Sequence, residues 1–96
     1  MTDTNKMVSR LFEHWRLDAT QRTTLFAMIA EDESIAIVLL QTHAMLRLLY
    51  PEHPLRYEWV MRGNTRINGD RPIDVMLTGS EGIMRVNKVL RGQLIR

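Results

Sequence analysis

The sequence predicts an all-α fold, a compact bundle of about six helices. Apolar residues recur at intervals of three and four positions, which is the period of helices that bury one face. No alternating run of β-branched residues reaches the length of a strand. Prolines and glycines stand where such helices would begin and end, so they divide the chain into short helical segments.

The first two helices follow from apolar spacing and from a capping sequence. A first helix from about Thr4 to Arg16 is predicted by five apolar residues at helical spacing: Met7, Val8, Leu11, Phe12 and Trp15. Asp18 and Gln21 have the spacing of a capping box, in which each side chain accepts a hydrogen bond from the other residue's backbone amide. They predict the start of a second helix, whose inward residues would be Leu25, Phe26, Met28 and Ile29.

The third helix is predicted to be the central and most buried one. It runs from about Ser34 to Tyr50, where Pro51 ends it, and it is apolar on almost every side. The macrodipole of a helix favours negative charge at its N-terminal end. That position is taken here by three carboxylates, Glu31, Asp32 and Glu33.

A fourth helix and a polar loop should follow. Pro54 is expected as the first residue of this helix, which stops at Gly63. Its apolar residues are Leu55, Trp59 and Val60. The segment 64–70 is mostly polar, contains turn-forming residues and is typical of a loop.

Two further helices complete the bundle. Pro72 opens a short fifth helix from Ile73 to Leu77, and Gly79 should close it. Ser80 is expected to cap the sixth helix. One face of that helix carries Ile83, Val86 and Leu90.

Composition excludes several classes of site. The chain has no cysteine, which rules out disulfides, thiolate nucleophiles and cysteine-bound metals. The N-terminus lacks the apolar core of a signal peptide, so we expect a cytoplasmic protein without a membrane span. The formal charge is +1 for residues 1–30, −3 for residues 31–60 and +4 for residues 61–96. The C-terminal third is therefore the end that would attract an anionic partner.

The residues carry little sign of catalysis. His14, His43 and His53 share no spacing that would hold a metal ion. The sequence has neither a nucleophile elbow nor a glycine-rich phosphate loop, so we expect no enzyme activity and no cofactor. Most methionines have core spacing, but Met61 and Met84 are candidates for an adaptable binding surface.

From Trp59 onward the chain resembles the C-terminal domain of MbcA/ParS/Xre antitoxins. The resemblance rests on nine residues in the order and spacing of that family: Trp59, Asn64, Gly69, Pro72, Asp74, Leu77, Gly82, Val86 and Leu90. It covers about half of the chain. The expected organisation is a truncated Xre-like, helix-turn-helix-like region over residues 1–44 and a toxin-binding domain over residues 45–96.

The resemblance implies a bacterial antitoxin that binds a RES-domain toxin, a protein that consumes NAD. Such antitoxins generally act as homodimers, and their C-terminal end lies at the toxin's active-site cleft, where steric occlusion suffices. The candidate toxin-binding residues are Asn64, Arg66, Met84, Arg91, Gly92, Gln93, Leu94, Ile95 and Arg96. The last six form a tail that we expect to be loosely packed. For a homodimer, the expected seam is the N-terminal helices or the third helix, with Phe12, Trp15 and Phe26 as candidate contacts.

Two other functions compete with the antitoxin. A helix-turn-helix regulator needs a recognition helix after its turn, but only residues 30–34 separate the second and third helices. This connector is acidic and would be repelled by phosphate, so we predict weak or no sequence-specific DNA binding by the chain alone. The other alternative is an orphan helical interaction module. A RES-type reading frame beside the gene would distinguish the antitoxin from that module.

The predicted burial of the third helix can be tested by truncating its side chains. Leu39→Ala and Leu46→Ala should each lower the free energy of unfolding by about 2–5 kcal/mol, because each would leave a cavity in the core. Chemical denaturation measures the loss. Neutral effects of both substitutions would contradict a central position for this helix.

Overall fold

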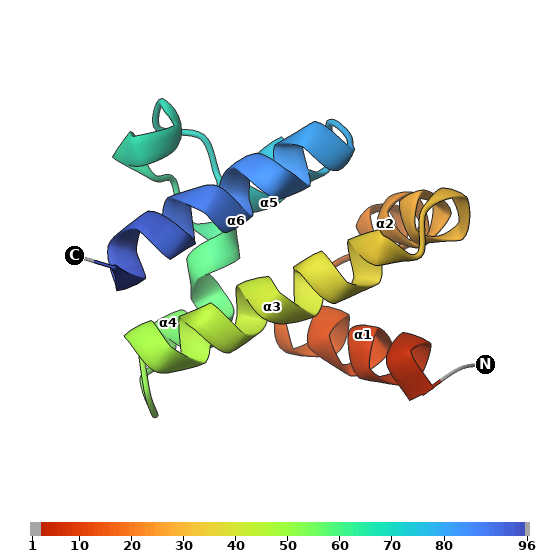
Figure 1. Cartoon of the computed structure of the whole chain (residues 1–96), viewed down its shortest axis with the longest axis horizontal. Helices are drawn as coiled ribbons and strands as arrows, with labels where there is room; N and C mark the ends of the chain where they lie inside the picture. Colours follow the sequence, from red (N-terminus) through yellow and green to blue (C-terminus); the bar gives the residue numbers. More distant parts are fainter. Residues whose placement is uncertain (1–2, 96) are drawn as a thin grey trace.

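The computed structural model describes residues 3–95, which form six α-helices and two short 3₁₀ helices without a strand (Figure 1). The all-α prediction of about six helices is confirmed. The elements are α1 (Asp3–His14), α2 (Ala19–Glu31), α3 (Ser34–Leu49), α4 (Leu55–Glu58), η1 (Trp59–Met61), η2 (Thr65–Ile67), α5 (Pro72–Met76) and α6 (Ser80–Leu94).

The turn between α1 and α2 is fixed by two caps. α1 ends earlier than predicted because Arg16 takes a left-handed conformation with φ of 58°. The amide of Leu17 then donates to the carbonyl of Phe12 at 3.1 Å, which gives the bonding of a Schellman turn. The predicted capping box is confirmed, since Gln21 N donates to Asp18 Oδ1 at 2.7 Å and Asp18 N donates to Gln21 Oε1 at 3.0 Å.

α3 is the central helix and lies against α1, α2, α4 and α6. Its inward side carries Ile35, Ala36, Leu39, Thr42 and Leu46, all buried. The prediction of a central, buried helix is confirmed, but its apolar residues do not all face inward. Ile37 is 50% exposed and Leu48 is 71% exposed, because both lie on the side of the helix opposite Leu39.

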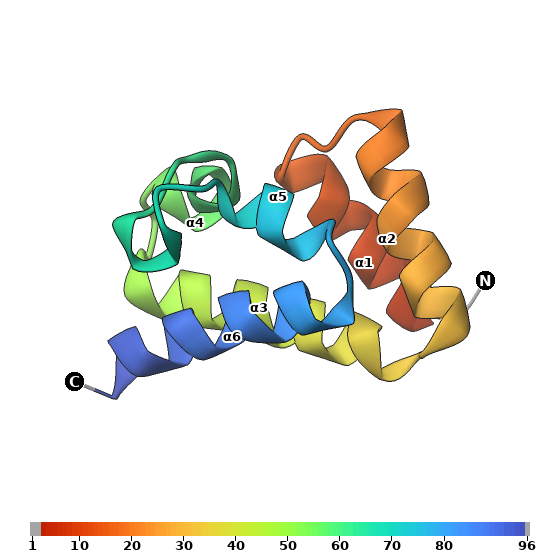
Figure 2. The ribbon, with the colours of Figure 1, turned by 90° about the horizontal axis from the view of Figure 1, so that it is seen from above.

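α3 and α6 lie side by side and run in the same direction (Figures 1 and 2). A polar contact crosses their apolar seam. Asn87 Nδ2 donates to Thr42 Oγ1 at 3.2 Å, and Thr42 Oγ1 donates to the carbonyl of Val38 at 2.8 Å. The second amide atom, Asn87 Oδ1, accepts from Arg91 Nη2 at 2.8 Å. A buried polar group costs free energy unless it is paired, so this contact favours one register of α6 along α3.

The N-terminal aromatic residues belong to the core of the single chain. Phe12 is fully buried and Trp15 is 1% exposed, while Phe26 packs against them from α2 and is partly buried. The rings of Phe12 and Phe26 meet edge to face, with centroids 5.1 Å apart. Phe12 and Trp15 are therefore unavailable as contacts between two copies, which corrects their proposed role in a dimer.

α6 begins against the backbone of α5, and Gly82 makes this approach possible. A Cβ atom at position 82 would overlap the carbonyl oxygen of Val75 and lie 2.9 Å from its carbonyl carbon. The N-cap of α6 is Gly79, with φ of 145°, and Ser80 is the first helical residue, so the expected cap at Ser80 was wrong. Pro54 likewise precedes α4 instead of beginning it.

A stack of rings joins α1, α3 and α4. The ring of Tyr57 lies between those of His14 and His43, with centroids 4.5 Å and 5.5 Å away. Nδ1 of His43 is buried and has no hydrogen-bond partner among the described residues. Burial, and then the nearby charges of Arg47, His14 and Arg56, lower the pKa of His43 to about 4.

The close approach at Gly82 predicts a large effect of a single methyl group. Gly82→Ala should lower the free energy of unfolding by about 3 kcal/mol, because α5 and α6 must move apart. Gly92→Ala in the same helix is the matched control, since nothing lies within 4 Å of a Cβ atom there. It should be neutral or stabilising by up to about 1 kcal/mol. Equal effects of the two substitutions, measured by denaturation, would contradict the packing described.

His43 predicts a dependence of stability on pH. The pKa of His43 is about 4 in the folded chain and has its ordinary value of 6.5 in the unfolded chain. Between these two pH values the unfolded chain binds this proton more readily than the folded chain does. The stability that neutral His43 contributes should be fully present above about pH 6.5 and should be lost as the pH is lowered toward 4. Thermal unfolding should therefore shift downward between about pH 7.5 and 5. The shift should be smaller in His43→Phe, and an equal shift in both proteins would contradict this assignment.

Candidate functional site

The loop between η1 and α5 is held together by Asn64. Its side-chain oxygen accepts from the amide of Arg66 at 2.9 Å, and its carbonyl accepts from Ile67 at 3.0 Å and from Gly69 at 2.8 Å. The turn then closes through Asn68 and Gly69, with φ of 59° and 81°. The predicted polar loop with turn chemistry is confirmed, and the fully buried Ile67 adds an apolar anchor to it.

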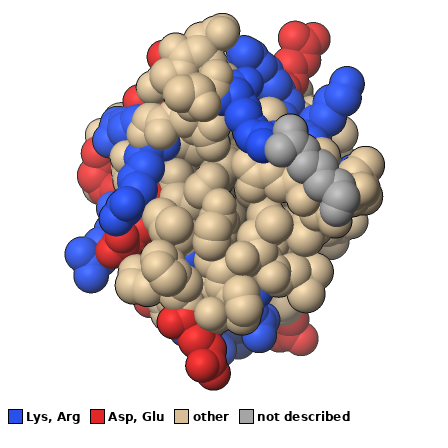
Figure 3. Space-filling model, turned by 90° about the vertical axis from the view of Figure 1, so that its left-hand side faces the viewer, with Lys and Arg blue, Asp and Glu red and all other residues tan. Residues whose placement is uncertain are grey.

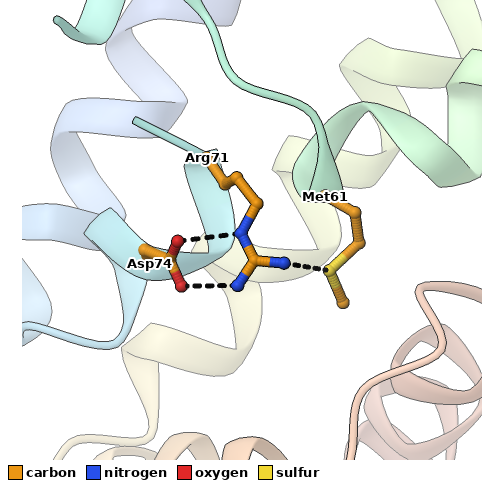
Figure 4. A network of polar contacts seen from close by, with 3 residues as sticks. All are labelled: Met61, Arg71 and Asp74. Carbon is orange, nitrogen blue, oxygen red and sulfur yellow. Dashed lines mark hydrogen bonds and ion pairs between the residues drawn. The ribbon is translucent and has the colours of Figure 1, made fainter. Parts of the chain in front are cut away.

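The loop is joined to α5 by a bidentate ion pair (Figure 4). Arg71 Nε donates to Asp74 Oδ2 at 2.8 Å, and Arg71 Nη2 donates to Asp74 Oδ1 at 3.0 Å. Hydrogen bonding from Arg71 lowers the pKa of the Asp74 carboxyl. A third guanidinium nitrogen, Nη1, lies 3.9 Å from the sulfur of Met61. Asp74, on α5, thus orients the guanidinium of Arg71 toward Met61 at the end of η1. Met61 therefore contacts a residue of its own chain.

The C-terminal tail is part of α6, which continues through Leu94. This corrects the expectation of a loosely packed segment after Leu90. Gly92, Gln93 and Leu94 are partly buried, whereas Ile95 is 81% exposed. Arg96, which was included among the toxin-binding candidates, lies outside the described residues.

The loop and the tail lie at the same end of the molecule in both ribbon views (Figures 1 and 2). The C-terminal end of α3 reaches this end as well. We call it the end face and define it by the loop 64–70 and by Leu48, Gln93, Leu94 and Ile95. Seen from this side, the surface is largely uncharged in the centre, with Lys and Arg on both flanks (Figure 3).

The end face unites most of the candidate binding residues but not all of them. Asn64 is partly buried and structural, and Arg66 is exposed in the same loop. Met84 is 51% exposed but lies eleven positions before Ile95, a distance of about 16 Å along α6. Leu48 was missed because it was counted among the core residues. Its position nine residues after the buried Leu39, half a turn away around the helix, was the signal that could have found it.

The remaining residues of the family motif have structural positions. Gly82 allows α6 to contact α5, and Pro72 is the first residue of α5. Leu77 is the partly buried C-cap of α5. The buried members are Trp59, Pro72, Gly82, Val86 and Leu90. They support the end face from within the chain.

The described residues contain neither a cluster of metal ligands nor a membrane-spanning helix. Within residues 3–95, no three His, Asp or Glu side chains are grouped so that they could hold a metal ion. In the same part of the chain, every helix is too short or too polar to cross a bilayer.

The family comparison agrees with this geometry. The model of the antitoxin Xre/MbcA/ParS C-terminal toxin-binding domain matches residues 45–93, which include the whole loop, α5 and nearly all of α6. Comparisons with curated proteins and with solved structures gave no match. The family match spans just over half of the chain and agrees with the resemblance seen from Trp59 onward. The chain therefore belongs to the Xre/MbcA/ParS antitoxin family and contains its C-terminal toxin-binding domain.

Proposed function

We propose that this chain neutralises a RES-domain, NAD-consuming toxin by covering the toxin's active-site cleft with the end face. The proposal rests on one observation: the loop 64–70 and the C-terminal turn of α6, both within the toxin-binding domain, lie at the same end of the molecule. The antitoxin performs no reaction in this account and needs no cofactor. It acts in the cytoplasm, on a toxin made in the same bacterial cell.

The chemistry of the end face suits a partly apolar cleft that carries acidic side chains. Leu48 and Ile95 supply exposed apolar surface, which gains free energy when it is buried against a partner. Arg66 has no ion-pair partner among the described residues, so its guanidinium is free to bind a carboxylate. Because α6 is already helical at Leu94, binding would require little ordering of the tail.

DNA recognition by the chain alone is not part of this proposal. α2 and α3 are separated only by Asp32 and Glu33. Asp32 accepts from the amide and the hydroxyl of Ser34, the first residue of α3, and these bonds lower the pKa of its carboxyl. The exposed carboxylates at this position disfavour a phosphate backbone. A homodimer, as the family resemblance implies, is a separate expectation.

The experiment measures binding of a RES-domain protein from the same bacterium. Ile95→Glu and Arg66→Glu change exposed side chains of the end face, so the chain should stay folded and bind at least about tenfold more weakly. Cells carrying either variant should lose protection from the toxin. Met7→Glu is the matched control, because Met7 is a 55% exposed apolar residue on α1, outside the end face.

Titration calorimetry separates the outcomes. Unchanged affinity of both end-face variants would place the contact elsewhere on the chain. Absence of any binding by the unmodified chain would instead contradict the antitoxin function and favour an orphan interaction module.

A further inference from the structure

A cavity of about 440 Å³, which we call the α1–α4 cavity, lies where the end of α1 faces residues 54–62. Residues 14–16 line it on one side, and Pro54, Tyr57, Glu58, Met61 and Arg62 line it on the other. Its volume falls within the range of small-molecule sites, about 300–1,000 Å³. The described residues that line it include no residue of the end face, so it is a separate feature of the surface.

Part of the cavity wall is aromatic and apolar. The ring of Tyr57 is partly buried and is stacked on that of His14, with centroids 4.5 Å apart. Trp15 is 1% exposed, and its indole N–H is buried without a hydrogen-bond partner among the described residues. The thioether of Met61 also lines the cavity, and its sulfur lies 3.9 Å from Arg71 Nη1 (Figure 4). Rings and a thioether offer a polarisable surface that suits a planar aromatic group.

The charge of the cavity is positive. Arg16 and Arg62 both line it, and both are exposed. Glu58 is the one carboxylate among its described lining residues, and it accepts from Arg62 Nη2 at 2.8 Å. Arg16 has no ion-pair partner among residues 3–95. The excess of guanidinium groups over carboxylates favours an anionic ligand.

Arg16 occupies a position that glycine would suit better. Its φ of 58° closes α1 in a left-handed turn, the conformation that glycine adopts at the least cost. The turn itself therefore does not explain an arginine at this position. Its amide donates to the carbonyl of Glu13 at 3.0 Å, and the next amide donates to that of Phe12 at 3.1 Å. These carbonyls near the end of α1 carry partial negative charge, and their pairing reduces the repulsion of an anion.

We propose that the α1–α4 cavity binds a small planar anion, an aromatic ring that carries a carboxylate or a phosphate. The ring packs against His14 and Met61, and the acid group accepts hydrogen bonds from Arg16 and Arg62. A guanidinium can donate two parallel hydrogen bonds to such a group, and Arg62 has donors left beside its bond to Glu58. Because the aromatic wall is already stacked, it needs little ordering on binding. The site does not depend on the antitoxin role or on the end face.

A titration followed by NMR of the backbone amides tests the site, with 1-naphthoate, 1-naphthyl phosphate and neutral 1-naphthamide as matched probes. Both anions should bind saturably with a Kd on the order of 0.1–1 mM, and the neutral probe should bind at least about tenfold more weakly. The shifts should concentrate in residues 14–16 and 54–62 and in the unpaired indole N–H of Trp15. The anion that binds more tightly identifies the acid group that the site prefers.

Three outcomes of this titration would overturn the proposal. The first is equal binding of the neutral probe, which would remove the role of charge. The second is a set of shifts centred outside the lining residues. The third is the absence of saturation by either anion at about 10 mM.

Substitution of Arg16 tests its role directly. Arg16→Gly removes the guanidinium and suits the left-handed turn, so the variant should fold with unchanged or higher thermal stability. Both anions should bind it at least about tenfold more weakly. Arg10→Ala is the matched control, because Arg10 is another exposed arginine of α1 that does not line the cavity, and it should bind like the unmodified chain. An unchanged affinity of Arg16→Gly, or an equal loss in Arg10→Ala, would show that the cavity is not the binding site.

Discussion

The contact of Asn87 with Thr42 is the constraint on which the arrangement of this molecule depends. The surrounding apolar residues, such as Leu39 and Val86, stabilise α3 against α6 but would tolerate small shifts along the helix axes. The hydrogen bond at 3.2 Å between two buried side chains tolerates such a shift poorly, because a slip leaves polar atoms without partners. The position of the tail relative to the end of α3 follows from this register.

A second constraint acts at the other end of α6. Gly82 lets this helix touch the backbone of α5, and α5 in turn carries the ion pair of Asp74 with Arg71 beside the loop. Hydrogen bonds to Asn64 hold the loop together, and the buried side chain of Ile67 anchors it to the core. The residues of the family motif thus mainly support the end face. The exposed side chains of the end face, among them Leu48, Arg66 and Ile95, are not motif residues.

The sequence predicted the helices well because their signals are local. The capping box at Asp18 and the start of α5 at Pro72 depend on neighbouring residues alone. The sequence could not predict that Ile67 would be buried, or that Gly82 would touch Val75, because these depend on how distant segments pack. Of the candidate binding residues, the loop and the tail lie at one end, whereas Met84 is remote from it. The proposed boundary at residue 44 stays a prediction, and α3 runs across it without a break.

Amide hydrogen exchange, recorded with and without a RES-domain toxin, can show whether the fixed register of α3 and α6 presents the loop and the tail together as one binding surface. In the free chain, the inner amides of α3 and α6 should exchange slowest and at similar rates, because both open only when the chain unfolds. Addition of toxin should slow exchange in the loop 64–70 and in the last turn of α6. Protection confined to α1 and α2, or exchange of α6 long before α3, would contradict the account.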